Sequence, residues 1–372
     1  MGNLVIIHFS PVELYPPAQN LLSELAKKNK KSWFVTTKNS SDNVLNFAIK
    51  SSRIRIIRVG KLPQNKRFLT RIFNYLYFYG VCLLLLIIKR PESILYFETL
   101  SSYSACLYKK YLNKNVNLLV HYHEYTSPEQ YRSGMKLEYY FHQIEKKIYD
   151  RYEWVSHTNR YRLSKFELDI LPNTIKKNAG KILPNYPPAR WKSDPKSTID
   201  FPVKVIYIGA LSLTTMYTKQ FADWVVAQRG RILWDIFSYN FADEARVYIK
   251  CLKSDWIRIH DGVNYEELPD ILRAYDVGVV LYNGHIPNYV NNAPNKLFEY
   301  LACGLDVWFP EVMTGSMDYV NKNGFPKVIS IDFNNLNKFD MAAAIERQGS
   351  ESKYLFFCEE ALEPLIGRLT QL

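Results

Sequence analysis

The sequence lacks the glycine-rich loops by which many nucleotide-binding enzymes are recognised. It contains no G-x-G-x-x-G and no G-x-x-x-x-G-K, so dinucleotide-dependent hydride transfer and P-loop chemistry lose their main support. It also contains no D-x-D, so a metal ion clamped between aspartates and a diphosphate is not supported. If the chain binds a diphosphate, positive side chains and helix amides must neutralise it instead.

Cysteine is scarce as well. The five cysteines are odd in number and form no C-x-x-C, which argues against a disulfide framework or a zinc ribbon. The first residues, Met-Gly-Asn-Leu-Val-Ile-Ile-His, lack the basic region of a signal peptide and indicate a buried strand. Both features favour a reducing, cytoplasmic location.

What the sequence does contain is a regular alternation of strand-like apolar runs and segments of helical spacing. The runs lie at 4–9, 33–36, 54–59, 94–97, 118–121 and 154–156, and again at 203–208, 232–237, 257–259, 277–281, 307–309 and 328–331. Such repeats predict parallel sheets with helices on both faces. The predicted fold class is therefore α/β, with two doubly wound Rossmann-like domains.

A stretch rich in proline and polar residues, starting at Pro184, separates the two sets of runs. Its composition is typical of a linker. We expect an N-terminal domain at 1–185, a linker at 186–202 and a C-terminal domain at 203–372. The last helix is a candidate to pack back on the N-terminal domain.

Open parallel sheets bind ligands beyond the carboxyl ends of their strands. Polar residues and glycines stand at these positions in both halves: Ser10, Thr37, Glu98, His123 and His157 in the first, and Gly209, Ser238, Asp261, Gly262, Tyr282 and Asn283 in the second. Two such rims facing each other would line a polar cleft.

One pair of histidines near the first rim is ambiguous. His121 and His123 alternate on a strand, so their side chains point to the same side. An H-x-H can hold a metal ion, but no third and fourth ligand is evident nearby, so no metal is expected. From the residues alone, a structural histidine is as good an interpretation as a catalytic one.

The strongest local signal is the stretch 292–304, Asn-Ala-Pro-Asn-Lys-Leu-Phe-Glu-Tyr-Leu-Ala-Cys-Gly. Pro294 suits a first helical turn and Gly304 suits a helix end, so a short helix is predicted. Its first-turn amides and Lys296 suit a diphosphate, and Glu299 could accept hydrogen bonds from two ribose hydroxyls. An ordinary amphipathic helix with a solvated glutamate fits the same spacing.

This stretch, P-x-K-x-x-E-Y-x-A-x-G, resembles the donor-binding signature of GT-B-fold glycosyltransferases, especially the retaining enzymes of glycosyltransferase family 4. Residues 205–211 resemble the strand and glycine turn that open the family's C-terminal domain. Residues 259–268 and 272–278 resemble its base-binding segment, and 121–126, His-Tyr-His-Glu-Tyr-Thr, resemble its D-x-H-E motif. The resemblance covers nearly the whole chain and is specific around 294–304.

The resemblance implies two domains facing a cleft and a role for each matching residue. Glu299 would bind the donor ribose, and Asn295 and Lys296 the diphosphate. Lys219 would also bind the diphosphate, after the glycine turn at Gly209. Val263 would touch the base through its backbone. His123 would be the catalytic residue on the acceptor side.

The chain also departs from the family pattern. Asn291 stands where the first glutamate of an E-x7-E pair is frequent, so it can bond a sugar hydroxyl but carries no charge. Ala210 stands where a basic residue often follows the opening glycine. These departures are compatible with an unusual acceptor or with weakened catalysis.

The positive charge is unevenly distributed. Residues 1–190 hold 30 Lys and Arg against 13 Asp and Glu, whereas residues 191–372 hold 18 against 23. The basic half indicates an anionic partner, such as a membrane surface or a phosphorylated lipid. The alternative is a basic face that only keeps the domain soluble. The charge is not gathered into a recognisable nucleic-acid module, so no nucleic acid is expected.

The segment 72–88 has no charged residue and lies between Arg71 and Lys89. It is slightly short for a membrane span and sits where the alternation requires a helix. We therefore favour a buried or interface-lying helix over a span.

The combined interpretation is a metal-independent, retaining glycosyltransferase that uses a nucleotide-diphosphate sugar as substrate and needs no cofactor. Its acceptor would be a glycan or lipid-linked glycan in surface polysaccharide assembly, at the inner face of the cell membrane. Two alternatives stay open: a nucleotide-sugar epimerase, which would need acid/base carboxylates in the N-terminal domain, and a non-catalytic sugar-nucleotide-binding partner protein.

Overall fold

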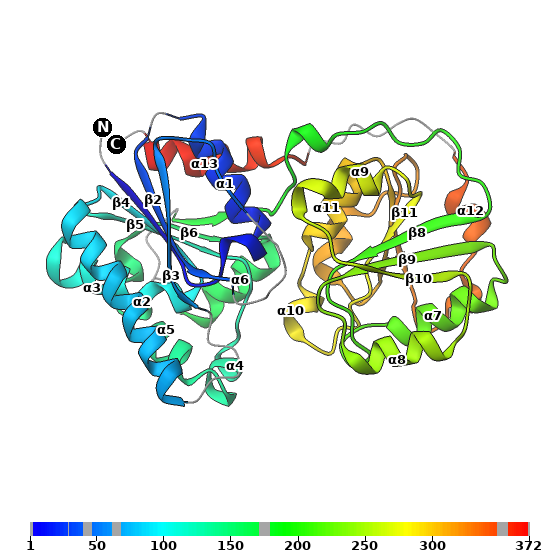
Figure 1. Cartoon of the computed structure of the whole chain (residues 1–372), viewed down its shortest axis with the longest axis horizontal. Coiled ribbons are helices and arrows are strands. Elements are labelled where there is room, and N and C mark those ends of the chain that lie inside the picture. The colour runs from blue at the N-terminus through cyan, green and yellow to red at the C-terminus, as the bar shows by residue number, and fades with distance from the viewer. Residues whose placement is uncertain are drawn as a thin grey trace. The chain divides into compact units, whose positions relative to one another are not determined.

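The computed structural model describes residues 3–28, 30–39, 47–61, 68–170, 179–347 and 356–370. The chain forms two compact units, each built around its own parallel sheet (Figure 1). Unit 1 comprises Met1–Asn185 and Cys358–Leu372, and unit 2 comprises Tyr186–Phe357. All twelve predicted apolar runs lie in or overlap strands, and the predicted fold class is confirmed.

Within the described residues, the sheet of unit 1 has seven parallel strands in the order β3-β2-β1-β4-β5-β6-β7. The central strands β1 and β4 are buried throughout, which explains why they read as continuous apolar runs rather than as alternating ones. The strands are β1 (Leu4–His8), β2 (Ser32–Lys38), β3 (Ile54–Lys61), β4 (Ser93–Phe97), β5 (Asn117–Tyr122), β6 (Tyr152–His157) and β7 (Gly180–Ile182).

Helices cover both faces of this sheet (Figure 1). One core contains apolar residues of α2, α3, α5 and α6, and the opposite core contains those of α1 and α13. The helices of unit 1 are α1 (Pro16–Ala26), α2 (Phe68–Lys89), α3 (Ser102–Leu107), α4 (Pro128–Ser133), α5 (Lys136–Lys146), α6 (Arg160–Asp169) and α13 (Cys358–Thr370).

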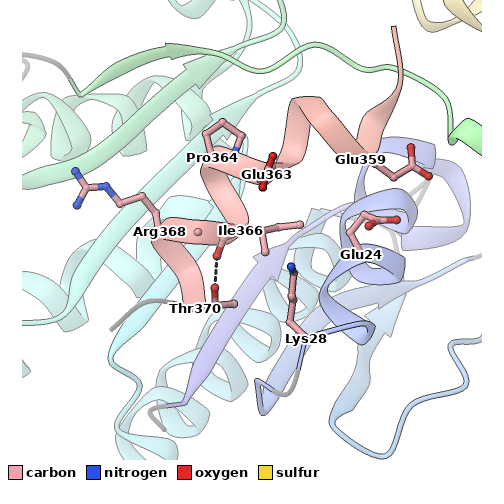
Figure 2. A pocket seen from close by; sticks show the side chains of 9 residues that line it. Glu24, Lys28, Glu359, Glu363, Pro364, Ile366, Arg368 and Thr370 are labelled. Atoms are coloured by element: carbon pink, nitrogen blue, oxygen red, sulfur yellow. Dashed lines mark hydrogen bonds between the residues drawn. The ribbon is translucent and has the colours of Figure 1, made fainter. Parts of the chain in front are cut away.

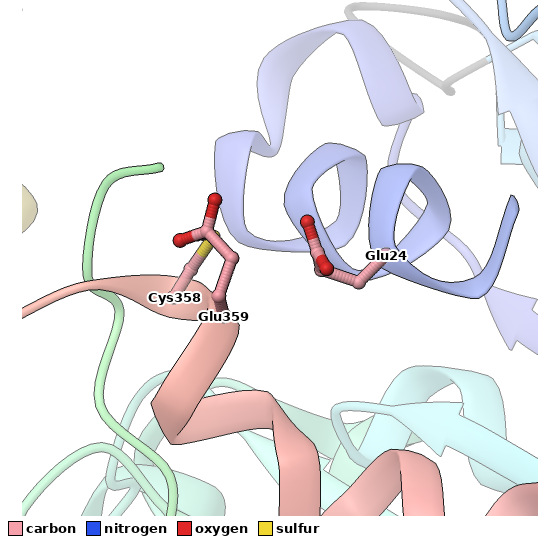
Figure 3. A group of neighbouring side chains, drawn as sticks. All are labelled: Glu24, Cys358 and Glu359. Atoms are coloured by element: carbon pink, nitrogen blue, oxygen red, sulfur yellow. Dashed lines mark hydrogen bonds between the residues drawn. The ribbon is translucent and has the colours of Figure 1, made fainter. Parts of the chain in front are cut away.

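The C-terminal helix α13 belongs to unit 1 and packs against α1. A hollow of about 690 Å³ lies between these two helices and is lined by charged side chains such as Lys28, Glu363 and Arg368 (Figure 2). At the start of α13, Cys358 and Glu359 come close to Glu24 (Figure 3). Because Glu24 already pairs with Lys27 at 2.5 Å, we interpret this group as a packing contact between α1 and α13 and not as a metal site.

Within the described residues, the sheet of unit 2 has six parallel strands in the order β10-β9-β8-β11-β12-β13. They are β8 (Val203–Ile208), β9 (Ile232–Ser238), β10 (Ile257–Asp261), β11 (Val277–Val279), β12 (Asp306–Pro310) and β13 (Val328–Ile331). The helices are α7 (Thr218–Ala227), α8 (Asp243–Cys251), α9 (Leu268–Leu272), α10 (Pro287–Val290), α11 (Asn295–Ala302) and α12 (Met341–Ile345).

Helix α11 packs on the sheet of unit 2 through several buried side chains, one of which is a tyrosine bonded to β8. Tyr300 is fully buried, and its hydroxyl oxygen accepts a hydrogen bond from the Ile208 amide at 3.1 Å. A Cβ on Gly278 of β11 would come within 2.0 Å of the Tyr300 ring, so the ring lies directly on a glycine of the central sheet. The neighbouring residue Glu299 is thereby held in a fixed position.

The predicted linker at 186–202 differs from expectation, because its first part is folded onto unit 2. Trp191 is 1% exposed and its ring lies 4.6 Å from that of Tyr265. The Ser193 amide bonds the Ala302 carbonyl at the end of α11, and Lys196 pairs with Asp276 at 2.6 Å. Proline-rich composition predicts a linker, but the buried Trp191 packs the first part of this segment onto unit 2 as a strap.

Candidate functional site

The sheet of unit 2 has a switch point between β8 and β11, where crossover helices leave toward opposite faces. These strands share just two register pairs, Val277 with Val205 and Gly278 with Ile206. The loop after β8 then crosses the end of β11, where the Tyr217 amide bonds the Leu281 carbonyl at 2.7 Å. The edge beyond these strand ends is where open α/β sheets take ligands.

Glu299 on α11 is a buried carboxylate, with 6% of its surface exposed. Burial raises its pKa to about 7, and the nearby Lys296 ammonium partly offsets this effect. Among the described residues no hydrogen-bond donor reaches this carboxylate. A buried acid without a donor costs stability unless a ligand supplies hydrogen bonds, so Glu299 is available for hydroxyl groups.

Lys296 lies over the glycine turn that follows β8. A Cβ on Gly209 would come within 2.7 Å of its Cε and 2.8 Å of its Nζ, and Gly209 has a φ of 128°. The ammonium also lies 5.8 Å from the ring centres of both Tyr207 and Tyr282. The positive φ favours glycine at this turn, and Gly209 and Lys296 together form one positively charged corner at the switch point.

The first turn of α11 adds amide donors to this region. Asn295 is the first helical residue after the N-cap Pro294. The amides of such a turn have no acceptor within the helix and carry the positive end of its dipole. Asn291 is buried, and its side-chain amide donates to the Pro287 carbonyl at 2.9 Å, where it closes α10.

The carboxyl ends of β9 and β10 carry a polar side chain and stacked aromatic rings. Ser238 is buried, and its hydroxyl has no hydrogen-bond partner within the described chain. The Phe237 and His260 rings stack at 4.4 Å, and a Cβ on Gly262 would collide with the Tyr239 ring. Val263 follows directly and is partly buried against the core. Ser238 pairs in register with Asp261, so the predicted base-binding position follows two residues after the partner of this serine.

Lys219 on α7 is positioned differently from Lys296. Its ammonium bonds the Asp223 carboxylate at 2.6 Å and the Tyr248 hydroxyl at 2.8 Å. The acid four residues further along the same helix, Asp223, holds this lysine in an ion pair. The diphosphate-binding role of Lys219 stays a prediction that would require this ion pair to open.

In unit 1, His123 lies in a cluster of buried rings just beyond the end of β5. Its ring stacks on Phe97 at 5.2 Å and lies 4.6 Å from Tyr15 and 4.5 Å from His121. Burial, followed by His121 and His8, holds its pKa well below the usual range. The Asn185 side chain lies near the imidazole and favours its charged form slightly, but neither ring nitrogen has a hydrogen bond of good geometry among the described residues. His123 is thus a neutral imidazole.

No family model matches the chain, and no curated protein matches its sequence. Solved structures do match it over its length. The sucrose-phosphate synthase of Thermosynechococcus elongatus has 16% identity and a TM-score of 0.69, with 100% of this chain and 98% of that chain covered. Anabaena Alr3699/HepE in complex with UDP and glucose has 12% identity and a TM-score of 0.65, with 100% of both chains covered. A putative UDP-N-acetylglucosamine 2-epimerase of Listeria monocytogenes has 12% identity and a TM-score of 0.60, with 98% and 95% covered.

The chain has the GT-B fold. Within this GT-B chain, Gly209 and Lys296 meet at the switch point of unit 2, with Glu299 on the same short helix. His123 belongs to unit 1.

Sequence reasoning missed one buried cation of the GT-B chain's first unit. Arg162 on α6 donates to the His123 carbonyl and, at 2.8 Å, to the Thr158 hydroxyl. It is 3% exposed and lies four residues before the buried Phe166. An arginine sharing a helix face with a core phenylalanine is the signal that could have revealed it.

Proposed function

We propose that the chain is a glycosyltransferase that moves a sugar from a nucleotide-diphosphate donor bound in unit 2. The observation that carries the proposal is the Glu299 carboxylate, which is buried and has no donor among the described residues, on the same short helix as Lys296. A ribose offers two hydroxyl donors to such a group, and the cation suits the adjoining diphosphate. Structural neighbours whose descriptions name UDP or a UDP sugar support the same donor class.

The main task of the proposed site is to stabilise the negative charge of the departing diphosphate. The bond from the anomeric carbon to the phosphate oxygen breaks, a bond from that carbon to the acceptor oxygen forms as the acceptor hydroxyl loses its proton, and the nucleoside diphosphate leaves with its negative charge. Lys296, Lys219 if its ion pair opens, and the first-turn amides of α11 would stabilise that charge without a metal ion. We propose retention of the anomeric configuration, in keeping with the family resemblance at 294–304, and an NMR spectrum of the product would test it.

The two lysines should differ in their effect on diphosphate binding. Lys296→Met is expected to weaken UDP binding by roughly 10- to 100-fold, the worth of a charged hydrogen bond, and to leave uridine binding nearly unchanged. Lys219→Met should have a smaller effect, because its ammonium is held by Asp223. Titration calorimetry with UDP and with uridine makes the comparison.

Equal losses for UDP and uridine in Lys296→Met would contradict the diphosphate assignment and give the lysine a role in the fold. A Lys219→Met loss as large as that of Lys296→Met would show that its ion pair opens on binding.

For the acceptor, we propose a glycan or a lipid-linked glycan at the cytoplasmic face of an anionic membrane, in polysaccharide assembly. The support is the excess of basic residues in the first half of the chain. His123 would act on the acceptor side, where a neutral imidazole can accept a hydrogen bond from a hydroxyl.

A second function is favoured by a specific observation in unit 1. The Glu98 carboxylate accepts hydrogen bonds from the amides of His123 at 2.6 Å and Glu124 at 3.2 Å. Burial, and then the Glu124 charge, raise its pKa to about 8, so Glu98 is protonated near neutral pH beside a second carboxylate. An acid and a base held together are what an epimerase needs to take a proton from a sugar carbon and return one to the opposite face.

One experiment separates these functions. Labelled UDP-glucose and UDP-N-acetylglucosamine are incubated with the protein, with or without a polyprenyl-diphosphate-linked sugar. We expect sugar transfer and UDP release that depend on the acceptor, and His123→Ala should lower the transfer rate about 100-fold or more without weakening UDP binding.

Interconversion of the donor sugar without acceptor, lost in Glu98→Gln, would instead establish an epimerase. Tight UDP binding with neither reaction would identify a non-catalytic binding protein. Loss of UDP binding together with melting temperature in His123→Ala would make that histidine structural.

A further inference from the structure

Helix α2 exposes an unusually apolar face. Eight large apolar side chains along its length are between 38% and 77% exposed: Leu69, Ile72, Phe73, Leu76, Tyr77, Leu84, Ile87 and Ile88. Their spacing of three, four and seven residues puts them on one side of the helix. Helix α2 has 22 residues, so this stripe is about 30 Å long. Within the described residues, the neighbouring π-helix η3 (Tyr108–Leu112) adds the exposed Tyr111 and Leu112.

The opposite side of α2 is an ordinary core face. Phe78, Cys82 and Leu86 are fully buried, spaced four residues apart, and pack on the sheet with residues of β3. The helix is therefore a working part of the fold as well as a carrier of exposed apolar surface. Soluble proteins rarely leave such a long apolar stripe uncovered without an interaction partner.

The topology argues against a membrane-spanning role, although Leu69–Lys89 is long and apolar enough to cross a bilayer, with a mean hydropathy of 1.8. The helix connects β3 to β4, which lie in the same parallel sheet. Its residues Phe78 and Leu86 are core residues of that sheet's helix layer. A span would pull this row out of the core, whereas a helix lying in the membrane plane keeps it there.

The basic residues near α2 indicate which kind of partner covers its exposed apolar face. Between Asp42 and Glu92 the chain has ten Lys or Arg and no Asp or Glu, and between Glu98 and Glu124 it has three Lys and again no acid. Arg71 on α2 is exposed. Arg55 is also exposed, and it lies on the same face of β3 as Ile57 and Val59, which is the face that α2 covers. The exposed Arg71 and Arg90 thus stand before and after most of the apolar stripe along the chain, whereas Lys109 is buried and Arg58 is paired with Glu13.

A second copy of the chain fits this surface poorly. A symmetric dimer through α2 would place the basic residues near α2 of one copy against those of the other. An anionic bilayer offers the opposite charge at its headgroups and apolar chains just beneath. Tyrosines at the stripe, Tyr77 and Tyr111, have the amphipathic rings that favour the membrane interface.

We propose that the exposed face of α2, with Tyr111 and Leu112, is a membrane-docking surface that lies flat in the headgroup region of an anionic bilayer. This inference specifies the membrane part of the proposed function but does not depend on any sugar transfer. It would be tested without donor or acceptor, so its failure would leave the donor-site proposal standing.

The test is co-sedimentation of the full chain with vesicles. We expect binding to phosphatidylcholine vesicles containing phosphatidylglycerol, much weaker binding to pure phosphatidylcholine, and a loss between about 50 mM and about 500 mM NaCl. Leu76→Ser with Leu84→Ser should lower partitioning at least about 10-fold. The matched control is Leu168→Ser with Val247→Ser, which removes equally exposed apolar side chains on α6 and α8 and should change nothing.

A separate experiment measures how deeply α2 lies in the bilayer. In a Cys251→Ser background, which removes the exposed native thiol, a fluorophore is placed at Leu69→Cys, Leu76→Cys, Leu84→Cys or Leu168→Cys. Lipids brominated near the headgroup should quench the three α2 positions equally and leave the α6 position unquenched. All variants are checked for an unchanged melting temperature.

Three outcomes would overturn the proposal. The first is an absence of sedimentation with anionic vesicles at low salt. The second is a lipid-free dimer that the Leu76→Ser, Leu84→Ser variant converts to monomer, which would assign the face to a second copy. The third is quenching that is deeper at residue 76 than at residues 69 and 84, together with extraction only by detergent, which would establish a span.

Discussion

At pH 8 the Glu299→Gln variant is expected to be more stable than the wild type and yet to bind UDP more weakly. Burial raises the pKa of Glu299 to about 7, above its ordinary value of 4.5. The native state therefore holds its proton more tightly than the unfolded chain does. This stabilising contribution is complete below pH 4.5 and is lost as pH rises through 7.

A neutral glutamine avoids that loss. From the size of the shift, the gain of the variant at pH 8 is on the order of 3 kcal/mol, and it should shrink steadily toward pH 5. UDP binding should fall by roughly 10- to 100-fold, because a carboxylate accepts the ribose hydroxyls more strongly than an amide does. Thermal unfolding from pH 5 to pH 8 and calorimetry with UDP at pH 8 measure the two effects.

Glu244→Gln, at an exposed position on α8 of the same unit, is the matched control and should alter neither property. A Glu299→Gln variant that is less stable at pH 8 and binds UDP normally would show that the carboxylate serves the fold. Opposite changes in stability and binding are the mark of a group kept for a ligand rather than for packing.

The strands of both sheets could be predicted because buried parallel strands leave long apolar runs. Strand β7 was missed, since it has three residues, begins with Gly180 and is not fully buried. The strap around Trp191 was also missed, because composition reports backbone preference and not which groove a tryptophan fills. The sequence therefore predicts strands with long apolar runs, and it misses short strands and segments whose packing depends on distant residues.

The residues of the candidate sites also fall into those that local sequence spacing predicts and those that it does not. Glu299 and Lys296 were predictable because one short helix carries both at fixed spacing. Glu98 appeared only as a rim residue, because its pKa is raised first by burial in the fold and then by the Glu124 charge, 26 positions away in the chain. The capture of Lys219 by Asp223 and Tyr248 likewise depends on two helices meeting. Contacts between elements decide which of several similar side chains stays available.

The fold of unit 2 is expected to fail when Gly278 is replaced. In Gly278→Ala the new Cβ would lie 2.0 Å from Cδ2 and 2.1 Å from Cγ of the Tyr300 ring. The ring is fully buried and its hydroxyl is tied to the Ile208 amide, so it has no free direction in which to move. Overpacking of this kind should destabilise unit 2 by about 3 kcal/mol. Because Tyr300 follows Glu299, UDP binding should weaken as well.

Denaturant unfolding of Gly278→Ala, Gly80→Ala, Tyr300→Leu and the double variant tests this arrangement. Gly80→Ala is the control, since that glycine is exposed on α2 with open space around it, and it should be neutral or stabilising by up to about 1 kcal/mol. Tyr300→Leu removes the ring and should be destabilising alone, but adding Gly278→Ala to it should then cost much less than in the wild type. Additive losses would mean that the glycine is needed for another reason. A non-additive result would show that the position of the candidate donor-binding helix is set by one ring lying on one glycine.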